Sequence, residues 1–201
     1  MKFLQALYVQ IRQALSWPVA LCGLLTALMM ELSVAGIIAG YFSGLDPYVN
    51  VWYLVNSNGA ALLTLFVAPA LPFAMSLARD WDSRAVPYWT VREGIARYTV
   101  SKLLASAAAG LLTVGLGLTL FVLGNGMFLP WFKSCSGVDY EALFEEGHIF
   151  LGWISYILHM SLSGALIGAL GMFMSILVPN QFGAVSAPLA IHLTVMRVIP
   201  T

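Results

Sequence analysis

Charged residues are scarce in this chain. Asp, Glu, Lys and Arg together make up 9% of its 201 residues, whereas 60% of the residues are hydrophobic. Soluble domains carry about 25% charged residues, so the composition excludes an ordinary soluble protein and indicates a membrane protein. The nine basic residues balance nine acidic ones, and nothing in this balance points to a nucleic-acid partner.

Cysteine is also rare, and internal repeats and low-complexity linkers are absent. Cys22 is expected inside the membrane and Cys135 outside it. Because these two positions lie at different levels, a disulfide between them is not expected. With no sign of a boundary along the chain, we treat residues 1–201 as a single membrane domain.

Long apolar runs are what the sequence has in abundance. About 20 apolar residues are needed to cross roughly 30 Å of hydrocarbon. Five segments meet this requirement: 17–42, 59–78, 103–124, 149–177 and 182–199. The sequence therefore predicts an all-α, polytopic membrane helix bundle with five spans. Pro69 and Pro72 are expected to kink the second span.

Residues 1–16 have a different pattern from the spans. Apolar side chains such as Phe3, Leu4 and Leu7 alternate with Gln5 and Arg12. This mixture is typical of an amphipathic helix that lies in the membrane interface. A signal peptide is not expected, because the apolar run that follows is of full span length and lacks a convincing cleavage site.

The distribution of charge predicts the orientation. Lys2 and Arg12 precede the first span, and five of the nine basic residues fall in the loop 79–102. The loop 125–148 carries mainly acidic residues. Since cytoplasmic loops are enriched in Lys and Arg, we expect the amino terminus and the loop 79–102 in the cytoplasm, the loop 125–148 outside, and a multi-pass protein of the plasma membrane.

The loop 79–102 also has the composition of a docking element. Pro87 and Gly94 are helix breaks, and between them lies a short amphipathic segment with Tyr88, Trp89 and Arg92. A short helix with large aromatic side chains suits insertion into a groove of a partner. The alternative is that these side chains form the inner aromatic belt and bind lipid phosphates.

Two segments resemble the membrane subunits of type-2 ABC exporters. In that family an acidic residue after the second span precedes a short coupling helix, and a basic residue, an aromatic and a lysine then open the third span. Asp80 or Asp82 would fill the acidic position, and residues 97–102 (RYTVSK) look like the closing part. Residues 175–182 (SILVPNQF), followed by Pro188, resemble the turn between the fourth and fifth spans. The family usually has six spans, whereas five are predicted here, which leaves Thr201 outside.

The resemblance implies a permease subunit that performs no covalent chemistry. It would export a peptide, an antimicrobial or a drug-like molecule, driven by a separate cytoplasmic ATPase that binds ATP and magnesium, and it would pair with a second copy or a homologous permease. No Walker-type glycine loop occurs in this chain, and we expect no cofactor, metal or catalytic residue in it. The coupling loop that would dock the ATPase contains Asp80, Trp81, Asp82, Arg84, Pro87, Tyr88, Trp89, Arg92 and Glu93.

A few polar residues fall inside the predicted spans. Glu31 and His159 are candidates for a translocation path, because an ionisable side chain in the membrane is costly. Each also fits a structural role as a hydrogen-bond partner between helices. The glycine pairs Gly36/Gly40 and Gly164/Gly168 have the four-residue spacing that lets helices approach closely.

Two alternatives to a permease are open. Ser161 or Ser163 with His192 would form a serine–histidine pair of an intramembrane hydrolase, but the glycines expected beside such a nucleophile are missing. The other alternative is a non-catalytic membrane scaffold or immunity protein, which needs neither a docking helix nor a translocation path.

Overall fold

The fold is built from helices. A computed structural model describes residues 2–46, 48–57, 65, 67–74, 76–133, 143–144, 146–177 and the single positions 183, 186, 190 and 194. Within this part of the chain every regular element is helical, as the sequence predicts. The elements are α1 (Lys2–Ala14), α2 (Trp17–Phe42), α3 (Val51–Ser57), the 3-10 helix η1 (Ala68–Ala70), α5 (Ser76–Asp82), α6 (Val86–Glu93), α7 (Ile95–Gly126) and α9 (Ile149–Leu177).

Among the described residues, three helices are long and apolar enough to cross a membrane. These are α2, α7 and α9, with 26, 32 and 29 residues. At about 1.5 Å per residue each exceeds the roughly 30 Å of a hydrocarbon core. Helices α2 and α9 have the bounds predicted for the first and fourth spans, whereas α7 begins eight residues before position 103. The structure is therefore that of a helical membrane protein.

The predicted second span, 59–78, is not one continuous α-helix where it is described. Residues 68–70 form η1, residues 71–74 are a turn, and α5 begins at Ser76. Pro69 and Pro72 explain the break, because proline lacks the N–H that an α-helix needs and clashes with the preceding turn. The predicted fifth span, 182–199, lies outside the described residues except for four single positions.

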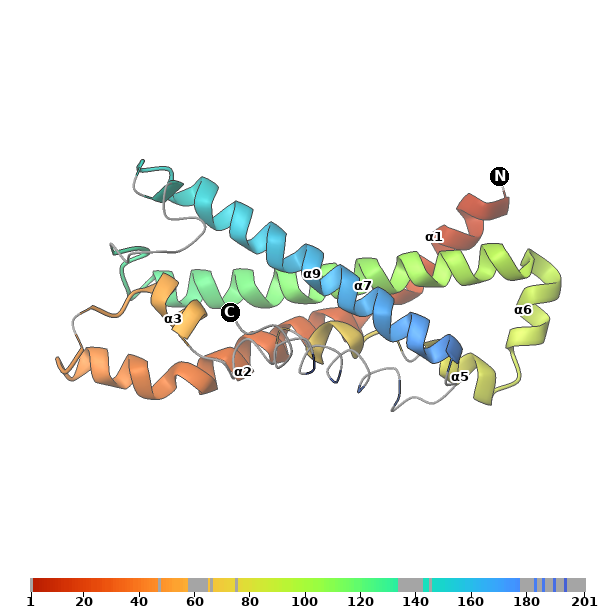
Figure 1. Ribbon diagram of the computed structural model, residues 1–201, viewed down its shortest axis with the longest axis horizontal. Coiled ribbons are helices and arrows are strands. Elements are labelled where there is room, and N and C mark those ends of the chain that lie inside the picture. The colour runs from red at the N-terminus through yellow and green to blue at the C-terminus, as the bar shows by residue number, and fades with distance from the viewer. Residues whose placement is uncertain are drawn as a thin grey trace.

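Helix α7 runs through the centre of the molecule. Figure 1 shows α9 crossing it and α2 extending along it, with α1, α5 and α6 at one end and α3 at the other. Both α2 and α9 contact α7, and α1 contacts α7 and α6. The two basic segments, around Arg12 and in the loop 79–102, are thus gathered at the same end of the bundle.

Helix α1 packs one face on the bundle. Ala6, Gln10 and Ala14 are buried, at a spacing of four residues, while Leu4 and Tyr8 are exposed. An apolar exposed side chain at the end of a membrane bundle is compatible with contact to lipid. The position of α1 in the membrane interface nevertheless stays a prediction.

Helices α7 and α9 approach each other through small residues. A Cβ atom built on Gly164 would lie closer than 3 Å to the carbonyl oxygen of Gly110, and one on Gly168 equally close to that of Ser106. The Ser106 hydroxyl donates a hydrogen bond to the Gly168 carbonyl, 2.8 Å long. The close packing expected for Gly164 and Gly168 is therefore confirmed. A Cβ atom on Gly36 or on Gly40, in contrast, would meet no atom of another described element within 4 Å, so close packing is not seen at this pair.

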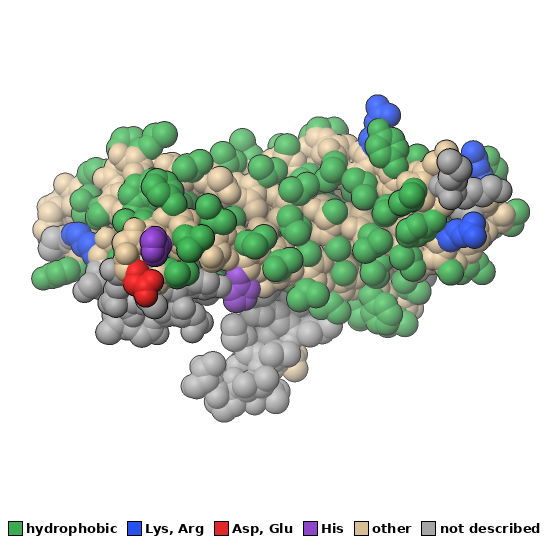
Figure 2. Space-filling view, turned by 90° about the horizontal axis from the view of Figure 1, so that it is seen from above, with side chains coloured by type: hydrophobic (Ala, Val, Ile, Leu, Met, Phe, Trp, Pro, Cys, Tyr) green, Lys and Arg blue, Asp and Glu red, His purple; other side chains and the backbone are tan. Residues whose placement is uncertain are grey.

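The outer surface of the bundle is apolar along its length. Figure 2 shows hydrophobic side chains over most of one face, with charged side chains toward the two ends. Many large apolar residues of α2 and α9 are exposed, among them Leu28, Leu32, Leu158 and Leu166. In water such a surface would aggregate, whereas in a bilayer it is solvated by acyl chains.

Replacing Gly164 by leucine should destabilise the bundle. The new side chain would meet Val114 and the backbone of Gly110, and overpacking of this kind costs about 1–3 kcal/mol. We expect a lower thermal midpoint for the detergent-solubilised protein. Gly36→Leu is the matched control, because the same change there enters open space and should leave the midpoint unchanged. Equal midpoints for the two variants would contradict the α7–α9 contact.

Candidate functional site

The polar end of the bundle begins with the turn between α5 and α6. The Arg84 N–H donates to the Trp81 carbonyl (3.0 Å) and the Ala85 N–H to the Asp80 carbonyl (2.9 Å). These two bonds form the usual closure of a helix whose next residue is left-handed. Arg84 takes that position with φ of 57°, where glycine is preferred, so this arginine is held at a cost of about 1 kcal/mol. Strain of this kind is often found at functional sites.

Pro87 and Gly94, the two helix breaks identified in the sequence, lie at the start and the end of α6. Pro87 stands in its first turn, where a missing N–H does no harm. Gly94 ends it with φ of 86°, a conformation that side chains rarely adopt. The chain then enters α7 directly at Ile95. The expected short helix between Pro87 and Gly94 is therefore present, and its role as a coupling helix stays a prediction.

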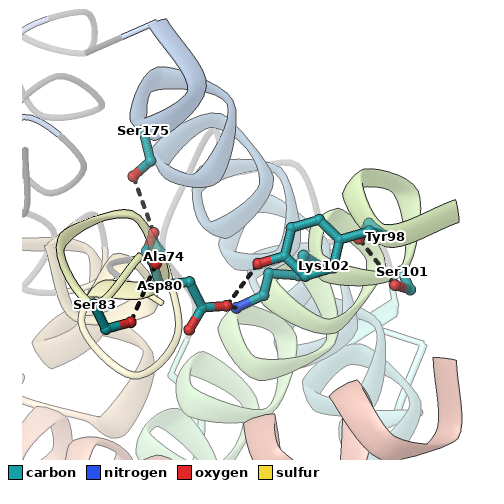
Figure 3. A network of polar contacts seen from close by, with 7 residues as sticks. All are labelled: Ala74, Asp80, Ser83, Tyr98, Ser101, Lys102 and Ser175. Carbon is teal, nitrogen blue, oxygen red and sulfur yellow. Dashed lines mark hydrogen bonds and ion pairs between the residues drawn. The ribbon is translucent and has the colours of Figure 1, made fainter. Parts of the chain in front are cut away.

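An ion pair links α5 to α7. The Lys102 ammonium lies 2.6 Å from Asp80 Oδ2, and the Tyr98 hydroxyl donates a 2.6 Å hydrogen bond to the same oxygen. Figure 3 shows Asp80 pointing from α5 toward both side chains of α7. Of the two acidic residues considered for this position, Asp80 is the one paired with Lys102.

The lysine of this pair is withdrawn from solvent. The Lys102 side chain is 3% exposed and that of Asp80 27%. The Lys102 ammonium also lies 5.4 Å from the centre of the Phe73 ring and 5.6 Å from that of Tyr98, within the range of cation–π attraction. A buried charge without its partner costs several kcal/mol, so the pair holds α5 against α7.

Apolar contacts support the same junction. Leu77, Tyr98 and Met172 form a buried cluster that joins α5, α7 and α9, and Val86 and Trp89 of α6 pack on it. Nearby, the Ser175 hydroxyl of α9 donates to the Ala74 carbonyl, 3.1 Å away. Figure 3 shows this bond beside the ion pair. The short helices are thereby attached to both long helices.

The predicted docking residues divide between two faces. Asp80 and Trp89 point inward, toward Lys102 and toward the Leu77–Tyr98–Met172 cluster respectively. Glu93 is the last residue of α6. The exposed members are Trp81, Asp82, Arg84, Pro87, Tyr88 and Arg92. Sequence alone did not separate these two groups.

A groove runs along the exposed side of α6. It has a volume of about 550 Å³ and is lined by Trp81, Arg84, Val86, Pro87, Thr90 and Ile95. Tyr88 and Val91 of the same helix do not line this groove but are also exposed, Val91 to 89%. Apolar side chains next to arginines at a polar end of the molecule form the kind of surface that protein partners bind.

The two candidate path residues lie apart. Glu31 of α2 accepts a 2.6 Å hydrogen bond from the Asn125 amide near the other end of α7. Asn125 itself is buried and also donates to the Phe121 carbonyl. His159 is exposed on the surface of α9. The contact of Glu31 matches the structural alternative, a carboxyl group hydrogen-bonded to another helix.

The serines of the hydrolase alternative bond to their own helix. The Ser161 hydroxyl donates to the Ile157 carbonyl at 2.6 Å, and the Ser163 hydroxyl to the His159 carbonyl at 3.3 Å. His192 lies outside the described residues. Within the described part of the chain, no three His, Cys, Asp or Glu side chains are grouped so as to hold a metal ion.

Several partners at these sites were not predicted from the sequence. The Asp80–Lys102 pair spans 22 positions; both residues belong to the segment that resembles the exporter family, but the sequence did not indicate that they contact each other. Phe73 gave no signal at all. Asn125 gave no signal as the partner of Glu31, because it is the first residue of the predicted loop 125–148.

Comparisons of the chain with models of known families, with curated proteins and with solved structures find no match. The resemblance to type-2 ABC exporters therefore rests on the two sequence segments.

Removing one member of the ion pair should destabilise the protein. Asp80→Asn leaves the buried ammonium of Lys102 without a carboxylate, for which we expect a loss of about 3 kcal/mol. Asp80→Asn combined with Lys102→Met should recover most of this loss, because no charge then remains buried. Chemical denaturation in detergent measures both. Asp46→Asn, which removes an exposed carboxylate away from this junction, is the control, and additive effects in the double variant would argue against the pair.

Glu31→Gln should be tolerated, because the glutamine carbonyl still accepts the hydrogen bond of Asn125. Glu31→Leu removes the acceptor and leaves a buried amide donor of Asn125 with one partner fewer, which costs about 1–2 kcal/mol. We expect a lower thermal midpoint for Glu31→Leu alone. If both variants lose stability to the same extent, the carboxylate acts by its charge and not by this bond.

Proposed function

We propose that this chain is the membrane-spanning permease subunit of an ATP-driven ABC exporter. A separate cytoplasmic ATPase, which binds ATP and magnesium, docks on α6 and the turn before it. A second copy of the chain, or a homologous permease, completes the translocation path through the lipid bilayer. The protein lies in the bacterial plasma membrane with its amino terminus in the cytoplasm. Its cargo is a peptide, an antimicrobial or a drug-like molecule.

The observation that carries the proposal is that one face of α6 packs on the bundle while the opposite face exposes large apolar side chains. Its inner face packs on the long helices through Val86 and Trp89. Its outer face presents Tyr88, Val91 and Arg92, all of which are exposed. A helix that only covered the end of the bundle would have no need of large apolar side chains on its outer face.

The contacts around α6 connect it to the long helices α7 and α9, so a movement of α6 can be passed on to them. A push on α6 reaches α9 through the Leu77–Tyr98–Met172 cluster and α7 through the Asp80–Lys102 pair. Packed elements shift as units between discrete arrangements. Docking energy would thus be converted into a change in how α7 and α9 pack, which is a population shift between two states of the bundle.

The basic end of the bundle supports the orientation. Arg12 of α1 and the arginines of the loop 79–102 lie at the end where α1, α5 and α6 meet (Figure 1). Clustered arginines favour the cytoplasmic side and would attract an acidic surface of the ATPase.

Changing the outer face of α6 should weaken ATPase binding and leave folding intact. We expect Tyr88→Ala with Val91→Glu to lower the amount of ATPase that co-purifies with the tagged chain at least tenfold, since apolar anchors at an interface contribute about 2 kcal/mol or more. The chain is expressed with its native neighbouring genes and solubilised gently. Because both side chains are exposed, the thermal midpoint should stay that of the wild type.

Two further variants make this experiment decisive. Phe150→Ala removes an equally exposed aromatic side chain near the start of α9 and should bind the ATPase normally. Trp89→Ala removes an inward contact and should lower the midpoint. If the wild-type chain is well expressed but no ATPase co-purifies with it, the proposal is overturned and a membrane scaffold is favoured.

A further inference from the structure

A polar cavity of about 230 Å³ lies where α1 and α2 meet the α5–α7 junction. Its polar lining consists of Gln13, Ser16, Ser76, Arg79, Asp80 and Lys102. A single water needs only about 10–15 Å³ measured in this way, so the cavity has room for a larger polar group.

The cavity lies at the level of a membrane boundary. Ser16 directly precedes α2, and Lys102 directly precedes the charge-free part of α7. Both helices therefore enter the hydrocarbon core just beyond the cavity. This is the level at which phospholipid headgroups lie, whichever side of the membrane it is.

The charge of the lining is positive. Asp80 already accepts hydrogen bonds from Lys102 and Tyr98. The positive charge of Arg79 is therefore not balanced by a carboxylate of the lining. Among the described residues Arg79 forms no ion pair. Its guanidinium presents several donors in one plane, the geometry that suits the oxygens of a phosphate.

A hydroxyl group in the lining also lacks a partner. Ser76 Oγ is buried and has no hydrogen-bond partner among the described residues. An unmet buried donor costs about 1–3 kcal/mol, and a ligand with acceptor oxygens would satisfy it. Phosphate oxygens accept such bonds, whereas a cation would leave the hydroxyl proton unmet and would face Arg79.

We propose that this cavity binds the phosphate group of an anionic phospholipid, held by Arg79 and Ser76. The lipid enters from the bilayer at the junction of α1 and α2, where Gln13 and Ser16 add polar contacts. Binding links α1 to the α5–α7 junction. The proposal does not depend on the exporter function.

The test measures lipid retention by the full-length protein. The chain is reconstituted in nanodiscs of phosphatidylcholine with phosphatidylglycerol, extracted gently, and examined by native mass spectrometry. We expect one retained phosphatidylglycerol per chain, with retention about tenfold weaker for Arg79→Gln and for Ser76→Ala. Arg84→Gln, an exposed arginine of the same segment that does not line this cavity, is the control and should retain the lipid as the wild type does.

Thermal stability, measured with and without the anionic lipid, distinguishes lipid binding from a merely structural role of Ser76. In phosphatidylcholine alone, Ser76→Ala should not lower the thermal midpoint, since the hydroxyl has no partner among the described residues to lose. With phosphatidylglycerol present, the wild type should gain thermal stability that Ser76→Ala does not. Inorganic phosphate is titrated in a parallel arm. Stabilisation by inorganic phosphate but not by the lipid would overturn the lipid as the source. Equal retention by Arg79→Gln and Arg84→Gln, or no retention by the wild type, would overturn the site.

Discussion

The buried ammonium of Lys102 is the constraint on which the polar end of the bundle depends. A charge 3% exposed at the entrance of a membrane helix is tolerated only if a carboxylate and hydrogen-bonding groups stay beside it. Asp80 must therefore remain against α7, and α5 with it. The phenolic hydroxyl of Tyr98 fixes the same carboxylate oxygen from one helical turn away.

The shape of the loop follows from this contact. Asp80 and Lys102 are adjacent in space. The chain between them must therefore turn away from α7 and come back, and α6 lies in this connecting segment. Pro87 and Gly94 set where it starts and stops. Trp89 then decides which face of α6 turns inward, so the opposite face, with Tyr88 and Val91, is left for another surface.

The sequence predicted helices better than it predicted contacts. The bounds of α2 and α9 were correct because their apolar runs end at polar or turn-forming residues. Helix α7 begins eight residues before the predicted span, since hydropathy marks the edge of the bilayer and not the end of a helix. In the second span the prolines gave the site of the break but not its 3-10 form. The Asp80–Lys102 pair depends on how helices assemble, which no local pattern encodes. The same holds for the hydroxyl of Ser76, which has no partner among the described residues.

Helix α7 contributes a polar side-chain contact near each of its ends. Lys102 near its start binds α5, and Asn125 near its end binds Glu31 of α2. These residues are 23 positions apart, which is about 34 Å along a helix. Between them, the helix is packed against α9 with backbone touching backbone at Gly110 and Gly164. Because few side-chain atoms separate the two backbones there, a shift of α7 under the proposed function would have to be accompanied by a shift of α9. A displacement that begins at α6 would then not be absorbed locally and would reach the opposite end, where Glu31 meets Asn125.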